Sequence, residues 1–161
     1  MITIRQAEKR DIEEIYKIVG IAVKFMRDHG NDAQWTNTEG IERKIASDIE
    51  KGQGFVVTDD DRVCAYFAFI IGPDPTYSYI EGSWPDDEEY GTIHRVASDG
   101  TVHGIMDHVL DFASSRINNI RIDTHELNST MRKKVTDKGF TYAGIIYVDD
   151  GTPRVAYWKK Y

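Results

Sequence analysis

The sequence predicts an α+β fold with the three layers of an α/β sandwich, in which helices cover both faces of one mixed, mostly antiparallel twisted sheet. Strand-like segments outnumber helix-like segments and follow the order β-α-α-β-β-β-α-β-α-β-β. Hairpin signals join some strands and helical segments join others, a combination typical of a mixed sheet. The chain has 161 residues and neither a linker nor an internal repeat, so we expect one domain over residues 1–161.

The first third of the chain predicts two amphipathic helices. In the first, Asp11 followed by Glu14 resembles a capping box, and Gly30 ends the helix. Thr38 can cap the second helix, which stops at Gly52. The apolar faces of these helices consist of Ile12, Ile15, Tyr16, Val19, Val23 and Met26 in the first, and of Ile41, Ile45 and Ile49 in the second.

Seven segments predict strands, because they are rich in the residues that strands favour. Turn signals at residues 59–61 and at Asp150-Gly151 make hairpins of two pairs of them. The third strand is almost continuously apolar, so we expect it to be buried on both faces. The seven strands are expected at residues 2–5, 55–58, 63–71, 92–97, 120–125, 141–148 and 154–159.

A polar turn at residues 98–101 separates the fourth strand from a third helix that starts near Gly104. Such a turn directs backbone N–H groups and the positive end of the helix dipole at one point, which suits a phosphate or a pyrophosphate. Asn128 can cap a fourth helix that extends through Lys138, with Gly139 at its C-terminal end. The apolar rows of the third helix are Ile105, Val109 and Phe112, and Met106, Leu110 and Ala113.

The bulk properties exclude several classes of protein. The net charge of −7 argues against nucleic acid as a partner, because phosphate binding normally needs a basic face. The longest apolar run, at residues 63–71, is too short to span a membrane, and the N-terminus lacks the apolar core of a signal peptide. Cys64 is the single cysteine, so no intramolecular disulfide forms and a cytoplasmic location is expected. No metal is expected, because the spacing of His103 and His108 does not suit a shared helical site.

The order of elements, with a phosphate-suited turn after the fourth strand, resembles the GNAT superfamily of N-acetyltransferases over nearly the whole chain. Members carry Q/R-x-x-G-x-G/A at this turn, and the matching residues 101–106 retain Gly104. The family's later motif, N-x-x-A-x-x-x-Y-x-x-x-G-F, resembles residues 128–140, with Met131 at the alanine position and Val135 at the tyrosine position. The stretches at residues 34–35, 81–84, 90–95 and 144–157 look like those of a bacterial GNAT group of unassigned substrate.

The resemblance implies the acyl-CoA N-acyltransferase fold, acetyl-CoA as co-substrate, and acetyl transfer to a primary amine of a small molecule or peptide by direct attack in a ternary complex. In relatives a tyrosine protonates the departing CoA sulfur, and Val135 lacks the hydroxyl for this step. A non-catalytic acyl-CoA-binding or sensing module on the same fold is therefore the alternative. The residues implied for binding the co-substrate are Val96, Ala97 and Ser98 at the strand end, Thr101, Val102, His103, Gly104, Ile105 and Met106 at the turn, and Asn128 and Met131.

Acetyl transfer to an amine also needs a base. His94, His125 and Glu81 are the candidates, since an imidazole titrates near neutrality and a loop carboxylate can bind or deprotonate an ammonium group. Each has a structural interpretation as well: a buried, hydrogen-bonded histidine, a strand-end histidine and a surface acid. Alternation along the fourth strand predicts that His94 shares a face with Val96 and that Arg95 lies on the opposite face.

Three loop aromatics, Trp35, Trp84 and Tyr90, are candidates for the walls of an acceptor pocket, because aromatic rings commonly line ligand sites and bind cations. Each can instead pack over an edge of the sheet. Trp84 lies in the long segment at residues 72–89, Tyr90 directly follows that segment, and Trp35 precedes the second helix. The four acids at residues 86–89 form either a solvated loop or a lip that attracts a cationic amine. An exposed edge strand near the C-terminus leaves a homodimer open.

Overall fold

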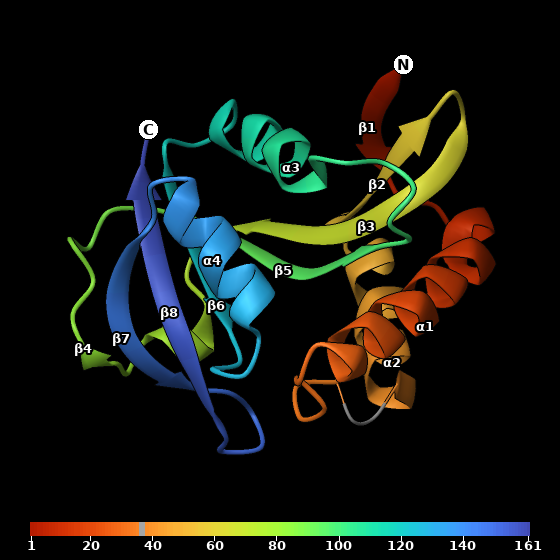
Figure 1. Cartoon of the computed structure of the whole chain (residues 1–161). Coiled ribbons are helices and arrows are strands. Elements are labelled where there is room, and N and C mark those ends of the chain that lie inside the picture. Colours follow the sequence, from red (N-terminus) through yellow and green to blue (C-terminus); the bar gives the residue numbers. More distant parts are fainter. Residues whose placement is uncertain (36–37) are drawn as a thin grey trace.

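The computed structural model describes residues 1–35 and 38–161, and in these ranges the strands form one eight-stranded sheet in the order β1-β2-β3-β5-β6-β8-β7-β4 (Figure 1). The β5–β6 pair is parallel and the other neighbours are antiparallel, so the prediction of a mixed, mostly antiparallel sheet is confirmed. The strands are β1 (Ile2–Gln6), β2 (Gly54–Asp59), β3 (Arg62–Ile71), β4 (Glu81–Gly82), β5 (Gly91–Ser98), β6 (Asn119–Thr124), β7 (Thr141–Tyr147) and β8 (Pro153–Lys160).

Helices pack on both faces of this sheet, which confirms the predicted layers (Figure 1). Neighbouring residues of β2 show the division: Val57 belongs to the core under α3 and α4, whereas Val56 belongs to the core under α1 and α2. A third apolar cluster lies beneath the segment at residues 72–89 and contains Tyr77 and Tyr90. The helices are α1 (Ile12–Asp28), α2 (Thr38–Glu50), α3 (Ile105–Ser114) and α4 (Ser129–Asp137), with single 3₁₀ turns η1 (Lys9–Asp11) and η2 (Pro75–Tyr77).

The ends of the first two helices differ from the sequence prediction. The Asp11 carboxylate makes no cap to α1, because it accepts hydrogen bonds from Arg5 and from the backbone N–H of Glu8. The capping box therefore belongs to η1, with Glu8 as the cap and Asp11 at its third position. Thr38 is the first helical residue of α2 rather than the residue before it.

A β-bulge in β5 changes which side chains share a face. Tyr66 pairs with Ala97 and Ala68 with His94, so two residues of β5 lie opposite the single residue between them on β3. One of the two, Arg95, has a φ of +53°, in the left-handed region that side chains other than glycine rarely occupy. The extra residue reverses the alternation beyond this point.

The predicted alternation is therefore wrong after His94. The guanidinium of Arg95 reaches Asp48 on α2, so Arg95 lies on the same face as His94. Val96 joins Ile93 in the core under α3 instead of sharing a face with His94. Alternation assumes an uninterrupted ladder, and the bulge breaks the ladder here.

β5 and β6 separate along the sheet, and this separation opens the site. They pair only from Gly91 with Ile120 to Ile93 with Ile122. Beyond these pairs β5 stays with β3 and β6 stays with β8. His94 is thus the first residue of β5 beyond the paired stretch, and Asp123 is the first of β6. We call the gap that begins at these two residues the opening.

The segment at residues 72–89, which we call the strap, crosses the sheet and contains the short strand β4 that the sequence analysis missed. The strap is fastened by Arg121 of β6, whose guanidinium lies 4.3 Å from the ring of Trp84 and 3.9 Å from the ring of Tyr90. Arg121 also donates to the carbonyl oxygen of Asp86 at 3.0 Å. Lys160 of β8 forms ion pairs with Asp86 and Glu88.

The edge of the sheet near the C-terminus is less open than the sequence predicted. β8 is internal, and β4 pairs with β7 at Gly144 and Ile145. Gly82 and Gly144 approach so closely that a Cβ atom on Gly82 would lie 2.2 Å from the carbonyl oxygen of Ala143. Both glycines have positive φ, so no other residue fits this contact without a backbone shift. None of the helices in the described ranges is long and apolar enough to cross a membrane.

Candidate active site

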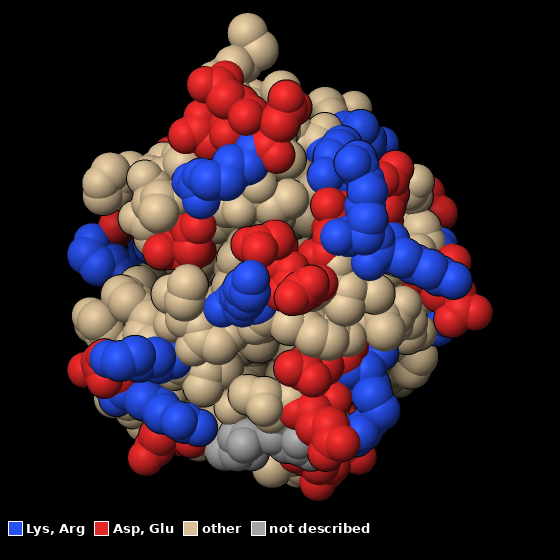
Figure 2. Space-filling model, turned by 90° about the vertical axis from the view of Figure 1, so that its right-hand side faces the viewer, with Lys and Arg blue, Asp and Glu red and all other residues tan. Residues whose placement is uncertain are grey.

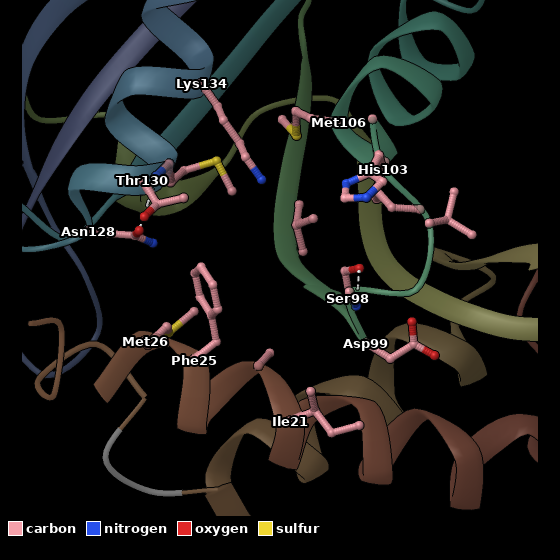
Figure 3. Close-up of a pocket in the computed structure, with 17 residues that line it drawn as sticks. Ile21, Phe25, Met26, Ser98, Asp99, His103, Met106, Asn128, Thr130 and Lys134 are labelled. Atoms are coloured by element: carbon pink, nitrogen blue, oxygen red, sulfur yellow. Dashed lines mark hydrogen bonds between the residues drawn. The ribbon is translucent and has the colours of Figure 1, made fainter. Parts of the chain in front are cut away.

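A pocket of about 480 Å³ lies between α1, the end of β5, the turn before α3, and α4 (Figure 3). Val96 and Ser98 line it from β5, beside the opening, and Asn128 lines it from the start of α4. The wall from α1 consists of Ile21, Ala22, Phe25 and Met26. Ile21 is 48% exposed and Phe25 is 47% exposed, so both side chains are open to a ligand in this pocket.

The turn before α3 presents a row of free backbone donors to this pocket. Ser98 and Asp99 accept hydrogen bonds from the backbone N–H groups of Gly100 and Thr101. The next five N–H groups, at residues 102–106, have no hydrogen-bond partner within the described ranges. Gly104, with a φ of +74°, allows the chain to enter α3 at a sharp angle. Free N–H groups at a helix N-terminus bind anions well, because the helix dipole adds to their partial charges.

The charges on the pocket wall also favour an anion. Asp99 and Lys134 are the charged side chains among the lining residues. Asp99 is neutralised by Arg62 at 2.8 Å, whereas Lys134 has no ion-pair partner within the described ranges and extends from α4 into the pocket (Figure 3). The wall of this pocket therefore carries one uncompensated positive charge, although the whole chain has a net charge of −7.

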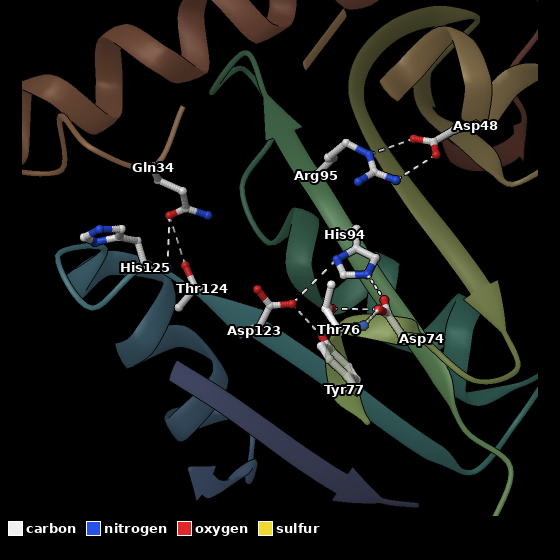
Figure 4. Close-up of polar contacts among 10 residues, drawn as sticks. All are labelled: Gln34, Asp48, Asp74, Thr76, Tyr77, His94, Arg95, Asp123, Thr124 and His125. Atoms are coloured by element: carbon white, nitrogen blue, oxygen red, sulfur yellow. Dashed lines mark hydrogen bonds and ion pairs between the residues drawn. The ribbon is translucent and has the colours of Figure 1, made fainter. Parts of the chain in front are cut away.

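On the opposite face, His94 stands at the opening between two carboxylates (Figure 4). Its Nε2 lies 2.8 Å from Oδ2 of Asp74, which belongs to the strap, and its Nδ1 lies 3.7 Å from Oδ1 of Asp123 on β6. The hydrogen bond to Asp74 places the proton of a neutral imidazole on Nε2 and leaves the lone pair on Nδ1. The His94 side chain is 18% exposed, so Nδ1 is within reach of a ligand in the opening.

The carboxylate that orients His94 is firmly ionised. Burial alone raises the pKa of Asp74, but hydrogen bonds from His94 and from Thr76 outweigh burial and lower the pKa to about 2. Tyr90 adds a further constraint, because its hydroxyl accepts a hydrogen bond from the Asp74 backbone N–H at 2.8 Å. Tyr90 therefore fixes the backbone of the strap at Asp74, and the Asp74 side chain reaches His94.

Comparisons with known proteins show which family the chain belongs to. The chain matches no protein-family model and no curated protein. A solved acetyltransferase of the GNAT family from Streptococcus agalactiae is 30% identical to it, with a TM-score of 0.88, over 99% of this chain and 95% of that one. The chain belongs to the GNAT family of acetyltransferases. GNAT proteins from Bacillus cereus (20% identity, TM-score 0.66) and Listeria monocytogenes (18%, 0.70) share the fold, each over 99% of this chain and at least 95% of their own.

The GNAT resemblance named eleven residues for the co-substrate, and the structure gathers nine of them around the pocket. Ala97 and Thr101 are not among the lining residues. Ala97 faces the core under α1 and α2, and the Thr101 hydroxyl is bound by Arg62 and Asp99. Whether the nine bind CoA stays a prediction. They are Val96, Ser98, Val102, His103, Gly104, Ile105, Met106, Asn128 and Met131.

The GNAT position usually held by tyrosine is fully buried here. Val135 is 0% exposed and packs in the core under α3 and α4, whereas the preceding residue, Lys134, faces the pocket. Lys134 and the α1 wall were missed by the sequence analysis. The available sequence signal for that wall was that Ile21 and Phe25 are apolar, lie one turn apart on α1 and are not part of the predicted apolar face.

The three candidate bases occupy very different places. His94 is at the opening, but Glu81 is on β4 at the far edge of the sheet, where it accepts a hydrogen bond from Tyr147. His125 follows β6, and burial, with a contribution from Arg154, lowers the pKa of its imidazole. Its Nδ1 accepts the backbone N–H of Leu127 at 3.0 Å, so the lone pair that a base needs is already used.

The three candidate aromatics are not brought together. Trp35 packs in the core under α1 and α2. Trp84 and Tyr90 enclose the guanidinium of Arg121, and Trp84 donates to the carbonyl oxygen of Tyr77. These contacts give Trp84 and Tyr90 a part in fastening the strap, and a role in binding an acceptor stays a prediction.

Gln34 was not singled out from the sequence as an individual residue, and it links the loop after α1 to the end of β6 and to α4. Its Oε1 accepts hydrogen bonds at 3.3 Å from the Thr124 hydroxyl and the His125 backbone N–H (Figure 4). It also accepts a hydrogen bond at 3.3 Å from the Asn128 amide. The loop after α1 is thereby tied to the end of β6 and to the cap of α4, where the Asn128 side chain accepts the Met131 N–H. Within the described ranges, no three His, Cys, Asp or Glu side chains are grouped to hold a metal ion.

Proposed function

We propose that this GNAT protein transfers an acetyl group from acetyl-CoA to a primary amine of a small molecule or peptide, by direct attack in a ternary complex. The observation that carries the proposal is the juxtaposition at the opening. A pocket with free N–H donors and an unpaired Lys134 lies on one side, and a carboxylate-oriented imidazole, His94, stands at the start of the gap. Acyl transfer to an amine needs both parts, an anchor for the donor and a base for the acceptor.

The residues around the pocket fit acetyl-CoA. The N–H groups at residues 102–106 and the ammonium of Lys134 suit a pyrophosphate, and the apolar wall of Ile21, Phe25 and Met131 suits a pantetheine chain. When bound there, acetyl-CoA supplies an activated thioester. The β-bulge at Arg95 and Val96 leaves a backbone group of β5 outside the ladder, and an N–H at this place can polarise the acyl oxygen.

His94 is the proposed base. Its Nδ1 carries the lone pair and accepts a proton from the amine, while the carboxylate of Asp74 stabilises the imidazolium that forms. Val135 offers no proton to the departing sulfur. A thiol with an ordinary pKa near 8.5 is a tolerable leaving group without one.

The test combines binding and turnover. Acetyl-CoA is titrated into the protein by calorimetry, and release of free thiol is then followed with a panel of primary amines. We expect binding, and turnover with at least one amine that falls about 100-fold or more in His94→Gln. The absence of acetyl-CoA binding would refute the proposal.

A second candidate function is a non-catalytic acyl-CoA-binding or sensing module on the same fold. The buried Val135 favours it, because the chain lacks the tyrosine hydroxyl that protonates the sulfur in relatives. Tight binding of acetyl-CoA without thiol release over the whole amine panel would favour this function over transfer.

A further inference from the structure

The charges at the opening do not balance. Two carboxylates, Asp74 and Asp123, flank the single imidazole of His94 (Figure 4). A neutral imidazole, which a base must be before it acts, compensates neither of them fully. Asp74 nevertheless receives three hydrogen bonds, from His94 Nε2 and from the backbone and hydroxyl of Thr76. The carboxylate that lacks compensation is therefore Asp123.

The two arginines nearest along the strands are occupied elsewhere. Arg95 forms a two-point ion pair with Asp48 of α2, with N···O distances of 2.7 and 2.8 Å. Arg121 is 4% exposed, lies between two aromatic rings and donates to the strap. On the face shown in Figure 2, acidic and basic side chains are interspersed.

Asp123 is arranged to accept one more donor. Its Oδ1 accepts the Tyr77 hydroxyl at 2.6 Å and lies 3.7 Å from His94 Nδ1. Its other oxygen has no hydrogen-bond partner within the described ranges and points away from both residues (Figure 4). The Asp123 side chain is only 10% exposed. This second oxygen is not fully buried, so a cationic donor in the opening can reach it, and in a site so little exposed the contact is screened less than at an open surface.

We infer that Asp123 binds the acceptor, and that the acceptor enters as a primary alkylammonium ion whose charge Asp123 compensates beside His94. The inference rests on the proposed function and names its substrate class. It sets alkylamines, which are cations at neutral pH, apart from arylamines, which are neutral and offer Asp123 no charge.

The ammonium held by Asp123 passes one proton to His94 Nδ1, and the nitrogen lone pair then attacks the thioester carbon. The C–N bond forms and the C–S bond breaks, with its electron pair leaving on sulfur. Of the two protons that the ammonium loses overall, one leaves His94 for solvent and the other ends on sulfur as the free thiol.

The experiment compares an alkylamine with an arylamine as acceptors, with thiol release as the readout. In Asp123→Asn, we expect the KM for the alkylamine to rise at least tenfold relative to the KM for the arylamine. Asp74→Asn is the matched control, because it touches His94 from the other side: kcat should fall for both amines while the KM ratio stays within threefold. Tyr77→Phe removes the hydrogen bond to Asp123 but keeps its charge, so it should also keep the ratio.

A second measurement needs no variant of Asp123. A trimethylammonium analogue of the best alkylamine carries the charge but cannot be acetylated, and its tert-butyl isostere is neutral. We expect the charged analogue to compete with the acceptor at least tenfold better than the neutral one. Equal inhibition by both, or an unchanged KM ratio in a folded Asp123→Asn protein that binds acetyl-CoA, would overturn the inference and leave the proposed function intact. A wild-type protein that acetylates no amine would overturn both.

Discussion

Replacement of Asp74 by asparagine tests whether the hydrogen bond from His94 to the strap contributes to kcat. The variant keeps the size of the side chain but removes the charge that faces His94 Nε2 at 2.8 Å. A hydrogen bond to a charged group is worth about 1.5–3 kcal/mol. If that energy is realised when His94 becomes an imidazolium, kcat falls about 10- to 150-fold, since each 1.36 kcal/mol is a factor of ten.

The same variant makes a separate prediction about stability. The pKa of Asp74 is about 2 in the folded protein and 3.8 ordinarily, a difference worth about 2 kcal/mol at neutral pH. Because the folded-state pKa is the lower one, this stabilisation is present above about pH 4 and is lost as the pH falls through about 2. The difference in unfolding free energy between wild type and Asp74→Asn should therefore shrink over this range.

Both assays are direct. Thiol release at saturating acetyl-CoA gives kcat, and urea unfolding at several pH values gives the free energies. His94→Gln provides the upper limit for the kinetic loss. A kcat in Asp74→Asn within twofold of wild type, in a protein with normal acetyl-CoA binding, would show that the hydrogen bond between Asp74 and His94 is structural only.

Three further variants test other parts of the site. Lys134→Met should weaken acetyl-CoA binding about fivefold and reduce its salt dependence, as measured by calorimetry at two ionic strengths, whereas Lys133→Met, which loses only an outward ion pair with Asp137, should not. Gly104→Ala has room for its Cβ, with the nearest atom at 3.6 Å, so we expect a loss of about 1–2 kcal/mol from backbone strain alone in thermal unfolding. Asp48→Ala leaves both Arg95 and the buried Tyr66 hydroxyl without their partner and should cost about 3–5 kcal/mol; a loss below 1 kcal/mol would mean that the bulge does not depend on the pair with Arg95.

The helices and most strands followed from the sequence because their apolar periodicity is local. β4 did not, since it is only two residues long and exists because Gly82 and Gly144 let two backbones meet. No local pattern records a contact between segments that are so far apart in the chain. The residues that line the pocket were largely anticipated for the opposite reason, since a strand, a turn and a helix start are contiguous in sequence.

The arrangement around His94 required the structure. The bulge places Arg95 in a left-handed conformation, and the Arg95 guanidinium pairs with Asp48 on α2. The partners of His94 come from the strap and from β6, and neither was among the candidate residues. Helix α4 is a similar case. The motif aligned Val135 with the tyrosine, but the structure places Val135 in the core and the neighbouring Lys134 along the pocket.

The strap has a consequence for attempts to alter the acceptor preference of this protein. Exchanging residues 72–89 for the corresponding loop of a relative also exchanges Asp74, the hydrogen-bond partner of His94. Under the proposed function this exchange alters the rate, because Asp74 is the partner of the proposed base. A chimera must retain Asp74, together with the tryptophan that stacks on Arg121, before its substrate range can be compared with that of the parent.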